Sequence, residues 1–116
     1  MVSLMIVDDS DEIRRTLRAV VADVADPIYE CHDGGEACAE FATHRPDWVL
    51  MDVSMRAMDG ITATRQIVQM FPTARIVIVT QYDDARFRKA AREAGACGYV
   101  LKDNLMEVRG FFDSIA

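Results

Sequence analysis

The sequence lacks the features of a secreted or membrane-spanning protein. Its cysteines are odd in number and form no C-x-x-C pair, so neither a disulfide framework nor a zinc finger is predicted from Cys31, Cys38 and Cys97. No apolar run approaches the roughly 18 residues that indicate a membrane span. No basic segment precedes the first apolar residues, as it would in a signal peptide. We therefore expect a cytoplasmic protein that contacts no membrane.

Glycine-rich phosphate loops are also missing. Neither G-x-G-x-x-G nor G-K-[ST] occurs, and Gly34-Gly35 after Asp33 is typical of a helix start, so nucleotide binding is not expected. Basic residues are the minority, 13 against 19 acidic ones, for a net charge of −6. Residues 1–58 carry 12 acidic and 5 basic residues (−7), and residues 59–116 carry 7 and 8 (+1). This acidic front half argues against nucleic-acid binding, because a phosphate backbone would repel it.

What the chain does have is the size and hydrophobicity of one globular domain. Its 116 residues are 51% hydrophobic, enough for a single domain over residues 1–116 with its own core. Five short apolar runs, at residues 4–7, 28–31, 48–51, 76–79 and 98–101, are typical of buried strands. Proline precedes three of these runs, at Pro27, Pro46 and Pro72.

Helical patterns alternate with these runs. The clearest apolar stripes are Ile13, Leu17, Val20, Val21 and Val24; then Phe87, Ala90, Ala91 and Ala94; then Leu105, Val108, Phe112 and Ile115. Strict alternation of strand and helix predicts an α/β fold: a doubly wound, five-stranded parallel sheet with helices on both faces.

Polar residues directly follow four of the five runs. Asp8 and Asp9 follow the first, Asp52 the third, Thr80 the fourth and Lys102 the fifth. In an open parallel sheet, ligands bind at the carboxyl ends of the strands, so these side chains are expected to converge on one edge. Lys102 is one of only two lysines, against eleven arginines.

Each of these residues also has a simpler interpretation. Asp8, Asp9 and Ser10 could be caps of the following helix, Asp52 could open a turn, Thr80 could cap another helix, and Lys102 could be a surface lysine. All of these explanations would have to hold together at matching strand ends. The combined pattern is therefore more specific than any single member.

Crowded carboxylates repel one another and require a cation. Oxygen ligands alone favour Mg²⁺ over zinc. A carboxylate beside Mg²⁺ can attack phosphorus and form an aspartyl phosphate, while an ammonium and a hydroxyl neutralise the phosphoryl oxygens. The predicted edge therefore suits transfer of a phosphoryl group onto an aspartate.

Over nearly the whole chain, the sequence closely resembles the receiver domain of bacterial two-component response regulators. The matching positions are Asp8-Asp9, Met51-Asp52-Val53-Ser54-Met55, Met58-Asp59-Gly60, Thr80 and Tyr99-Val100-Leu101-Lys102. The ending Val-Leu-Lys-Asp is similar to receivers attached to helix-turn-helix transcription factors. The resemblance implies the strand order 2-1-3-4-5.

The resemblance also implies roles for individual residues. Asp52 would be phosphorylated by a partner histidine kinase or phosphotransfer protein. Mg²⁺ would be held by Asp8 or Asp9, Asp52 and the backbone carbonyl of Ser54. Thr80 and Lys102 would contact the phosphoryl oxygens, and Tyr99 would be a switch residue coupled to Thr80.

Two surfaces follow from the same resemblance. The fourth helix carries Arg86, Arg88, Lys89 and Arg92, which form either a solvated face or part of a surface for a partner or a homodimer, together with the fifth strand and fifth helix. The first helix, with Arg14, Arg15 and Arg18, is the expected docking surface for the kinase.

Three positions depart from the family pattern. Arg56 replaces the usual proline four residues after the phosphoacceptor, and Gln81 replaces a small residue after the switch threonine. Both are interpreted as modulators of access to Asp52. Asp103 replaces the proline that often follows the lysine, which puts the geometry around Lys102 in question.

Two other functions stay open at this point. The chain could be a degenerate receiver that acts as an interaction module without phosphate, or a small phosphohydrolase with an aspartate nucleophile. An enzyme is not expected, beyond catalysis of the chain's own phosphorylation and dephosphorylation, because the chain lacks the length for a substrate-covering cap. No output domain is expected within residues 1–116, whether the receiver acts alone or was cut from a longer regulator.

Overall fold

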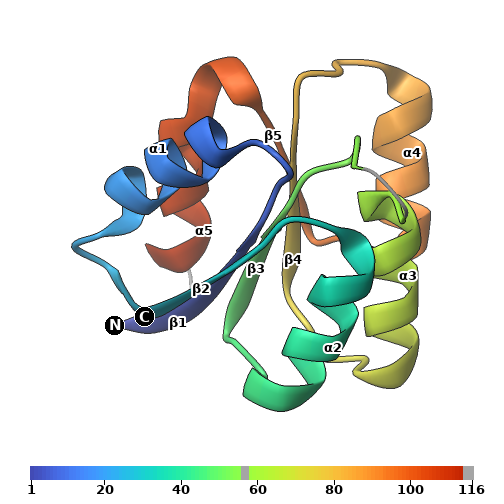
Figure 1. Cartoon of the computed structure of the whole chain (residues 1–116). Coiled ribbons are helices and arrows are strands. Elements are labelled where there is room, and N and C mark those ends of the chain that lie inside the picture. The colour runs from blue at the N-terminus through green and yellow to red at the C-terminus, as the bar shows by residue number, and fades with distance from the viewer. Residues whose placement is uncertain (56–57, 114–116) are drawn as a thin grey trace.

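One parallel sheet forms the centre of the molecule (Figure 1). The computed structural model describes residues 1–55 and 58–113, so Arg56 and Ile115 lie outside the described residues. The five strands are β1 (Val2–Val7), β2 (Ala25–Cys31), β3 (Trp48–Met51), β4 (Ile76–Thr80) and β5 (Gly98–Leu101). Their order is β2-β1-β3-β4-β5, and each neighbouring pair is parallel. The predicted fold class and strand order are confirmed.

Helices cover both faces of this sheet (Figure 1). They are α1 (Asp11–Val21), α2 (Gly34–His44), α3 (Gly60–Met70), α4 (Ala85–Ala94), the 3₁₀ helix η1 (Lys102–Glu107) and α5 (Val108–Asp113). In Figure 1, α1 and α5 lie on one side of the sheet, and α2, α3 and α4 lie on the other. Among the described residues, no helix combines the length and the apolar character needed to cross a bilayer.

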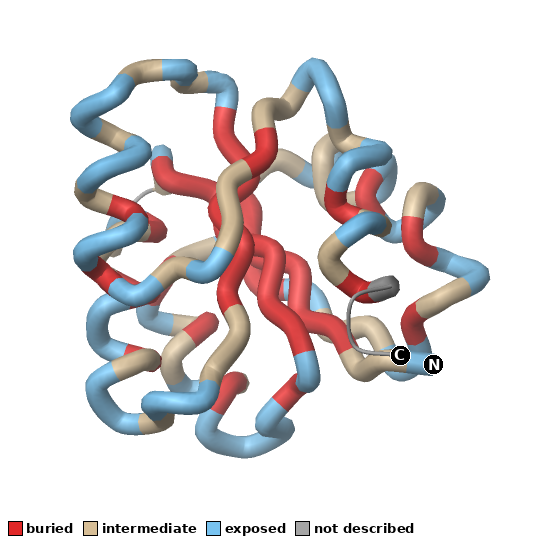
Figure 2. The backbone as a smooth tube through the Cα atoms, turned by 180° about the vertical axis from the view of Figure 1, so that it is seen from behind, coloured by how far each residue is buried: buried red, intermediate tan, exposed pale blue. Residues whose placement is uncertain are grey.

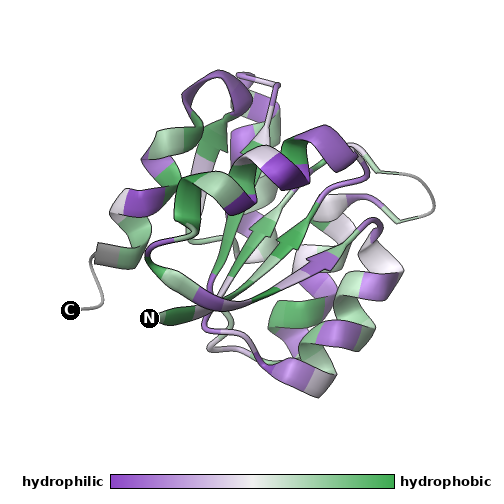
Figure 3. Cartoon of the chain, turned by 60° about the vertical axis from the view of Figure 1, so that its left-hand side comes forward, coloured by the Kyte–Doolittle hydropathy of each residue, from purple (hydrophilic) through white to green (hydrophobic). Residues whose placement is uncertain are grey.

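Alternating side chains in the strands divide the core in two. Along β1, Leu4 and Ile6 join the cluster beneath α1 and α5, while Met5 and Val7 join the cluster beneath α2, α3 and α4. All four are at most 1% exposed. Figure 2 shows this buried centre, and Figure 3 shows the apolar sheet between helices whose outward sides are more hydrophilic. A continuous apolar run was the correct signal for a strand buried on both faces.

Side-chain caps fix where four helices begin. Ser10, Asp33, Asp59 and Asp84 each accept a hydrogen bond from a backbone N–H in the first turn of the helix that follows. Ser10 therefore caps α1, and neither Asp8 nor Asp9 does. Asp84, and not Thr80, caps α4. Gly34 starts α2 directly after Asp33, as predicted.

Two details of the secondary structure differ from expectation. β2 begins at Ala25, so Pro27 lies inside the strand and not before it. This is tolerated because β2 is an edge strand, and its register with β1 shifts between Val2 and Leu4, beside the proline. The last helical stripe is also not one α-helix: Leu105 belongs to η1, where Asn104 departs from helical geometry, and α5 begins only at Val108.

Gly60 permits the closest backbone approach near the predicted site. A Cβ atom at Gly60 would lie 1.7 Å from the carbonyl oxygen of Asp52, whereas a Cβ at Gly110 would meet nothing within 4 Å. We expect Gly60→Ala to lower the free energy of unfolding by on the order of 2–3 kcal/mol. Gly110→Ala is the matched control and should be neutral or stabilising, because alanine favours helix. Urea unfolding of both variants tests this, and equal midpoints would contradict it.

Candidate functional site

The carboxyl ends of β1 and β3 bring two aspartates together in the interior. Asp8 follows β1 and Asp52 follows β3, and the Asp52 N–H donates to the carbonyl of Val7 at 2.8 Å. Asp8 is 1% exposed and Asp52 is 3% exposed, while Asp9 lies exposed beside them. Oxygen atoms of these three aspartates lie within 4.8 Å of one another. The structure therefore brings the predicted carboxylates together.

Lys102 reaches the same place from β5. Its Nζ atom lies 3.0 Å from Oδ2 of Asp8 and 3.1 Å from Oδ1 of Asp52. Burial lowers the pKa of Lys102, but its contacts with the two carboxylates outweigh burial and raise that pKa overall. The lysine is therefore a fixed positive charge between Asp8 and Asp52. The departure at Asp103 does not displace it, and the Lys102–Asp103 peptide bond is trans.

The electrostatics of Asp52 reflect a shortage of positive charge. The pKa of Asp52 is raised from 3.8 to about 6. Burial is the main cause and repulsion from Asp8 is the second, while Lys102 lowers the pKa and so limits the increase. One ammonium thus pairs with two buried carboxylates, those of Asp8 and Asp52.

These donors fit Mg²⁺. They are all oxygen atoms, which are the ligands that Mg²⁺ prefers in proteins. Asp8 Oδ2 is buried and pairs with the Lys102 ammonium at 3.0 Å, and a carboxylate oxygen has a second lone pair with which it could bind a cation. Asp8, Asp9 and Asp52 would supply side-chain oxygens, and the exposed Ser54 is two residues beyond Asp52.

Thr80 and Tyr99 both contact one loop residue that the sequence analysis missed, Tyr82. Thr80 is fully buried at the end of β4, and its Oγ1 accepts a hydrogen bond from the N–H of Tyr82 at 3.2 Å. The Tyr99 hydroxyl donates to the carbonyl of Tyr82 at 2.7 Å, and the guanidinium of Arg88 lies 4.5 Å from the centre of the Tyr99 ring. An aromatic residue two positions after a strand carries no sequence signal for this role.

Two of the three arginines expected on the kinase-docking helix are bound within the domain. Arg14 donates to the carbonyl oxygen of Asp8 at 2.6 Å and also pairs with Asp11 and Glu30. Arg18 pairs with Glu30 at 2.8 Å. These contacts join α1 to β2 and to the turn after β1. Arg15 is exposed and forms no ion pair with the described residues.

The basic residues of α4 are also largely paired. Arg86 contacts Asp84, Arg88 contacts Asp83, and Lys89 lies 3.8 Å from Glu93. These pairs are exposed, so each contributes little to stability. They reduce the net positive charge that the helix presents.

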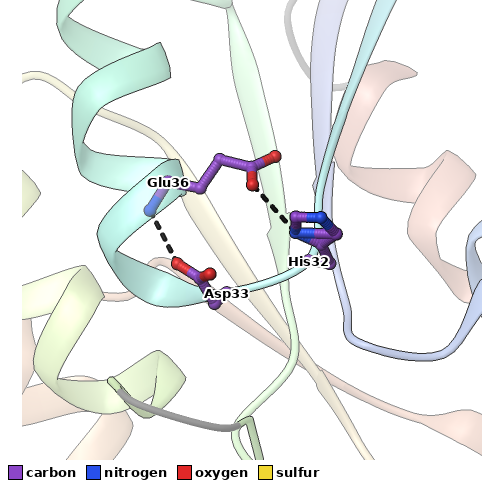
Figure 4. Close-up of side chains that lie close together, drawn as sticks. All are labelled: His32, Asp33 and Glu36. Carbon is purple, nitrogen blue, oxygen red and sulfur yellow. Dashed lines mark hydrogen bonds and ion pairs between the residues drawn. The ribbon is translucent and has the colours of Figure 1, made fainter.

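A second group of ligand-type atoms lies at the end of β2 (Figure 4). His32, Asp33 and Glu36 bring one ligand atom each within 4.8 Å of one another. Figure 4 shows the contacts of Asp33 and of His32 with Glu36. The Asp33 carboxylate accepts a hydrogen bond from the N–H of Glu36 at 2.8 Å, and the Glu36 carboxylate lies 2.8 Å from Nδ1 of His32. A helix cap and an ion pair between residues 32 and 36 account for this cluster, which is more exposed than the aspartate cluster.

Comparison with known proteins identifies the family of the chain. The family model of the response regulator receiver domain matches residues 4–108. The transcriptional regulatory protein YhcZ of Bacillus subtilis is 39% identical over 102 residues, which cover 86% of this chain and 48% of that protein. The chemotaxis protein CheY of Halobacterium salinarum is 34% identical, covering 85% of this chain and 82% of that protein.

A solved structure extends this likeness to three dimensions. A LuxR-family two-component response regulator from Aurantimonas sp. SI85-9A1 superposes with a TM-score of 0.88 at 34% identity, covering 99% of this chain and 84% of that chain. The chain spans about half the length of several curated relatives that it matches. Activities of those longer proteins therefore do not transfer directly.

The raised pKa of Asp52 predicts a dependence of stability on pH. The folded state holds the proton more tightly than the unfolded state, so the stabilising contribution of protonation is complete below pH 4 and is lost as the pH rises through about 6. Asp52→Asn cannot ionise. The unfolding free energy of Asp52→Asn minus that of the parent should therefore increase by on the order of 2–3 kcal/mol between pH 4 and pH 7.5.

Denaturant unfolding in a buffer with a chelator measures this difference without metal. Asp47→Asn, at an exposed aspartate next to the start of β3, is the matched control and should show no such growth. A constant difference between Asp52→Asn and the parent across the pH range would show that Asp52 is not destabilised by its surroundings.

Proposed function

The chain belongs to the response regulator receiver domain family, and on that premise we propose that it is a phosphoryl-accepting signalling receiver. Asp52 takes the phosphoryl group in a Mg²⁺-dependent reaction from a partner histidine kinase or phosphotransfer protein. The observation that carries the proposal is the position of Lys102 within 3.1 Å of both Asp8 and Asp52.

The chemistry follows from the residues of the site. A carboxylate oxygen of Asp52 attacks phosphorus, and the bond from phosphorus to the donor breaks, so the phosphoryl group ends on Asp52. Asp8, Asp9, Asp52 and the Ser54 carbonyl would hold Mg²⁺, which would supply positive charge to neutralise the phosphoryl oxygens. Lys102 contacts a phosphoryl oxygen from the side of β5, and the Thr80 hydroxyl donates to another.

Phosphorylation changes the forces on the switch residues. It adds a charge of about −1.5 to −2 and three strong acceptors beside Thr80. Because Thr80 and Tyr99 both hydrogen-bond to the backbone of Tyr82, movement of the Thr80 hydroxyl toward the phosphoryl group alters the contacts of Tyr99 as well. The surface of α4 and β5 is changed by a shift between existing conformations.

This surface is the proposed site of output. Tyr99 lies on β5 with Arg88 of α4 stacked on its ring, so the two elements respond together. We assign it to a partner or to a homodimer formed through α4, β5 and α5. The proposed signalling role requires no nucleic acid bound by residues 1–116.

Labelling with a small acyl phosphate tests the function. With acetyl phosphate and Mg²⁺ the parent should gain one phosphoryl group on an acidic residue, and Asp52→Asn should gain none, because the attacking oxygen is gone. Intact-protein mass spectrometry measures the added mass, and peptide mapping places it. Asp47→Asn, an exposed aspartate next to the start of β3, should be labelled as fully as the parent.

Two outcomes would contradict the proposal. Labelling that persists in Asp52→Asn would place the phosphoacceptor elsewhere. An unlabelled parent that also gives no change in tyrosine fluorescence with beryllofluoride and Mg²⁺ would favour the phosphate-independent interaction module. Trp48 is a poor reporter here, since it begins β3 and packs on Phe112 of α5, about 13 Å from Asp52.

A further inference from the structure

A second groove opens at the edge of the sheet opposite the aspartates. The ends of α2 and α3 and the starts of β3 and β4 meet at this edge (Figure 1). The groove has a volume of about 410 Å³, which lies within the usual range of small-molecule sites. Its walls combine apolar and basic side chains, among them Phe41, Met70, Phe71, Arg45 and Arg75.

Arg45 enters this groove with an unusual backbone conformation. It follows the last residue of α2 with φ 46° and ψ 57°, and it is the one non-glycine residue with positive φ in the described part of the chain. Glycine is the usual residue at such a helix end, because a Cβ atom disfavours the left-handed region. The Arg45 guanidinium lies 4.1 Å from the centre of the Phe71 ring. Strained residues cluster at binding sites, so this side chain is a candidate ligand contact.

Arg75 is oriented by a hydrogen bond and by an aromatic ring. Its Nε donates to the carbonyl of Asp47 at 3.1 Å, and its guanidinium lies 5.1 Å from the centre of the Trp48 ring. Neither Arg45 nor Arg75 forms an ion pair with a described residue. The terminal nitrogens of two oriented guanidiniums are therefore available to an anion.

The charges around the groove favour a negatively charged ligand. Asp47 is the one acidic residue among the described residues that line it, against two arginines. The Asp47 carboxylate already accepts a hydrogen bond from the N–H of Ser3 at 2.9 Å. Planar guanidiniums pair with carboxylates and phosphates through two parallel hydrogen bonds, and the apolar wall favours a ligand with an apolar body.

We propose that this groove binds a small organic anion, whose carboxylate or phosphate pairs with Arg45 and Arg75 and whose apolar body packs on the aromatic wall. A protein partner would require a wider apolar surface, and Met70 is the one exposed large hydrophobic residue among the described residues of the lining. The site is separate from Asp52, which lies beyond the opposite end of β3.

Titration with two small anions tests the inference. Cyclohexanecarboxylate and cyclohexyl phosphate are added in a buffer that contains a chelator and no phosphodonor, so the result does not depend on phosphorylation of Asp52. Calorimetry and the fluorescence of Trp48, the only tryptophan and a neighbour of Arg75, measure binding. At least one of the two anions should bind with a dissociation constant in the millimolar range or below. Neutral cyclohexanecarboxamide and inorganic phosphate should each bind about tenfold more weakly, because one lacks the charge and the other the apolar body.

Substitution of each arginine locates the bound anion. Arg45→Gly removes the guanidinium and suits the left-handed backbone, so it should weaken binding about tenfold while the midpoint of urea unfolding is unchanged or higher. Arg75→Gln should weaken binding to a similar extent. Arg65→Gln, at an exposed arginine of α3 outside the lining of this groove, is the matched control and should bind as the parent does.

Four results would overturn the inference. They are the absence of heat and of a fluorescence change with both anions, parental affinity in both Arg45→Gly and Arg75→Gln, equal affinities for the carboxylate and the carboxamide, and equal affinities for cyclohexyl phosphate and inorganic phosphate. A blocked Asp-Leu-Glu peptide that binds where both small anions fail would assign the groove to an acidic protein segment instead.

Discussion

Burial of two like charges beside one lysine is the constraint on which the rest of the site depends. Asp8 and Asp52 are almost completely excluded from solvent, and the single ammonium of Lys102 lies between them. Separating such charges from water is costly, so the arrangement persists only because the sheet leaves the side chains no other position. In the proposed function, this uncompensated charge attracts a divalent cation and then, with the cation, a phosphoryl group.

The sheet holds these groups in place through its register. Val7 pairs with Met51, so the residues that follow β1 and β3 emerge side by side, and Thr80 pairs with Leu101, which places Lys102 one residue farther along. A shift of one residue in either pairing would send these side chains to the opposite face. The strand pairing that packs core residues on both faces of the sheet is the same pairing that sets where Asp8, Asp52 and Lys102 emerge. Packing and site geometry therefore have one cause.

The sequence was sufficient for the fold and for the residues that meet at the acidic edge. Strand ends are easy to locate from apolar runs, and the topology then brings Asp8, Asp52 and Lys102 together. Interactions of loops with one another were not accessible in this way. Tyr82 became visible only through its contacts with Ser54 and Phe87, which depend on how two loops pack. Pro27 was misplaced because an edge strand tolerates a proline that a central strand would exclude.

Arg14 has a consequence for how docking and metal binding relate. Its guanidinium fastens α1 to the carbonyl of Asp8 and, through Glu30, to β2. One side chain thereby joins the surface of α1 to the acidic turn. Thermodynamic linkage then requires reciprocity: if a protein that binds α1 alters the affinity of the turn for a cation, the cation alters the affinity for that protein by the same factor. The affinity of such a docking partner would then depend on whether a cation occupies the site, before any phosphoryl group is transferred.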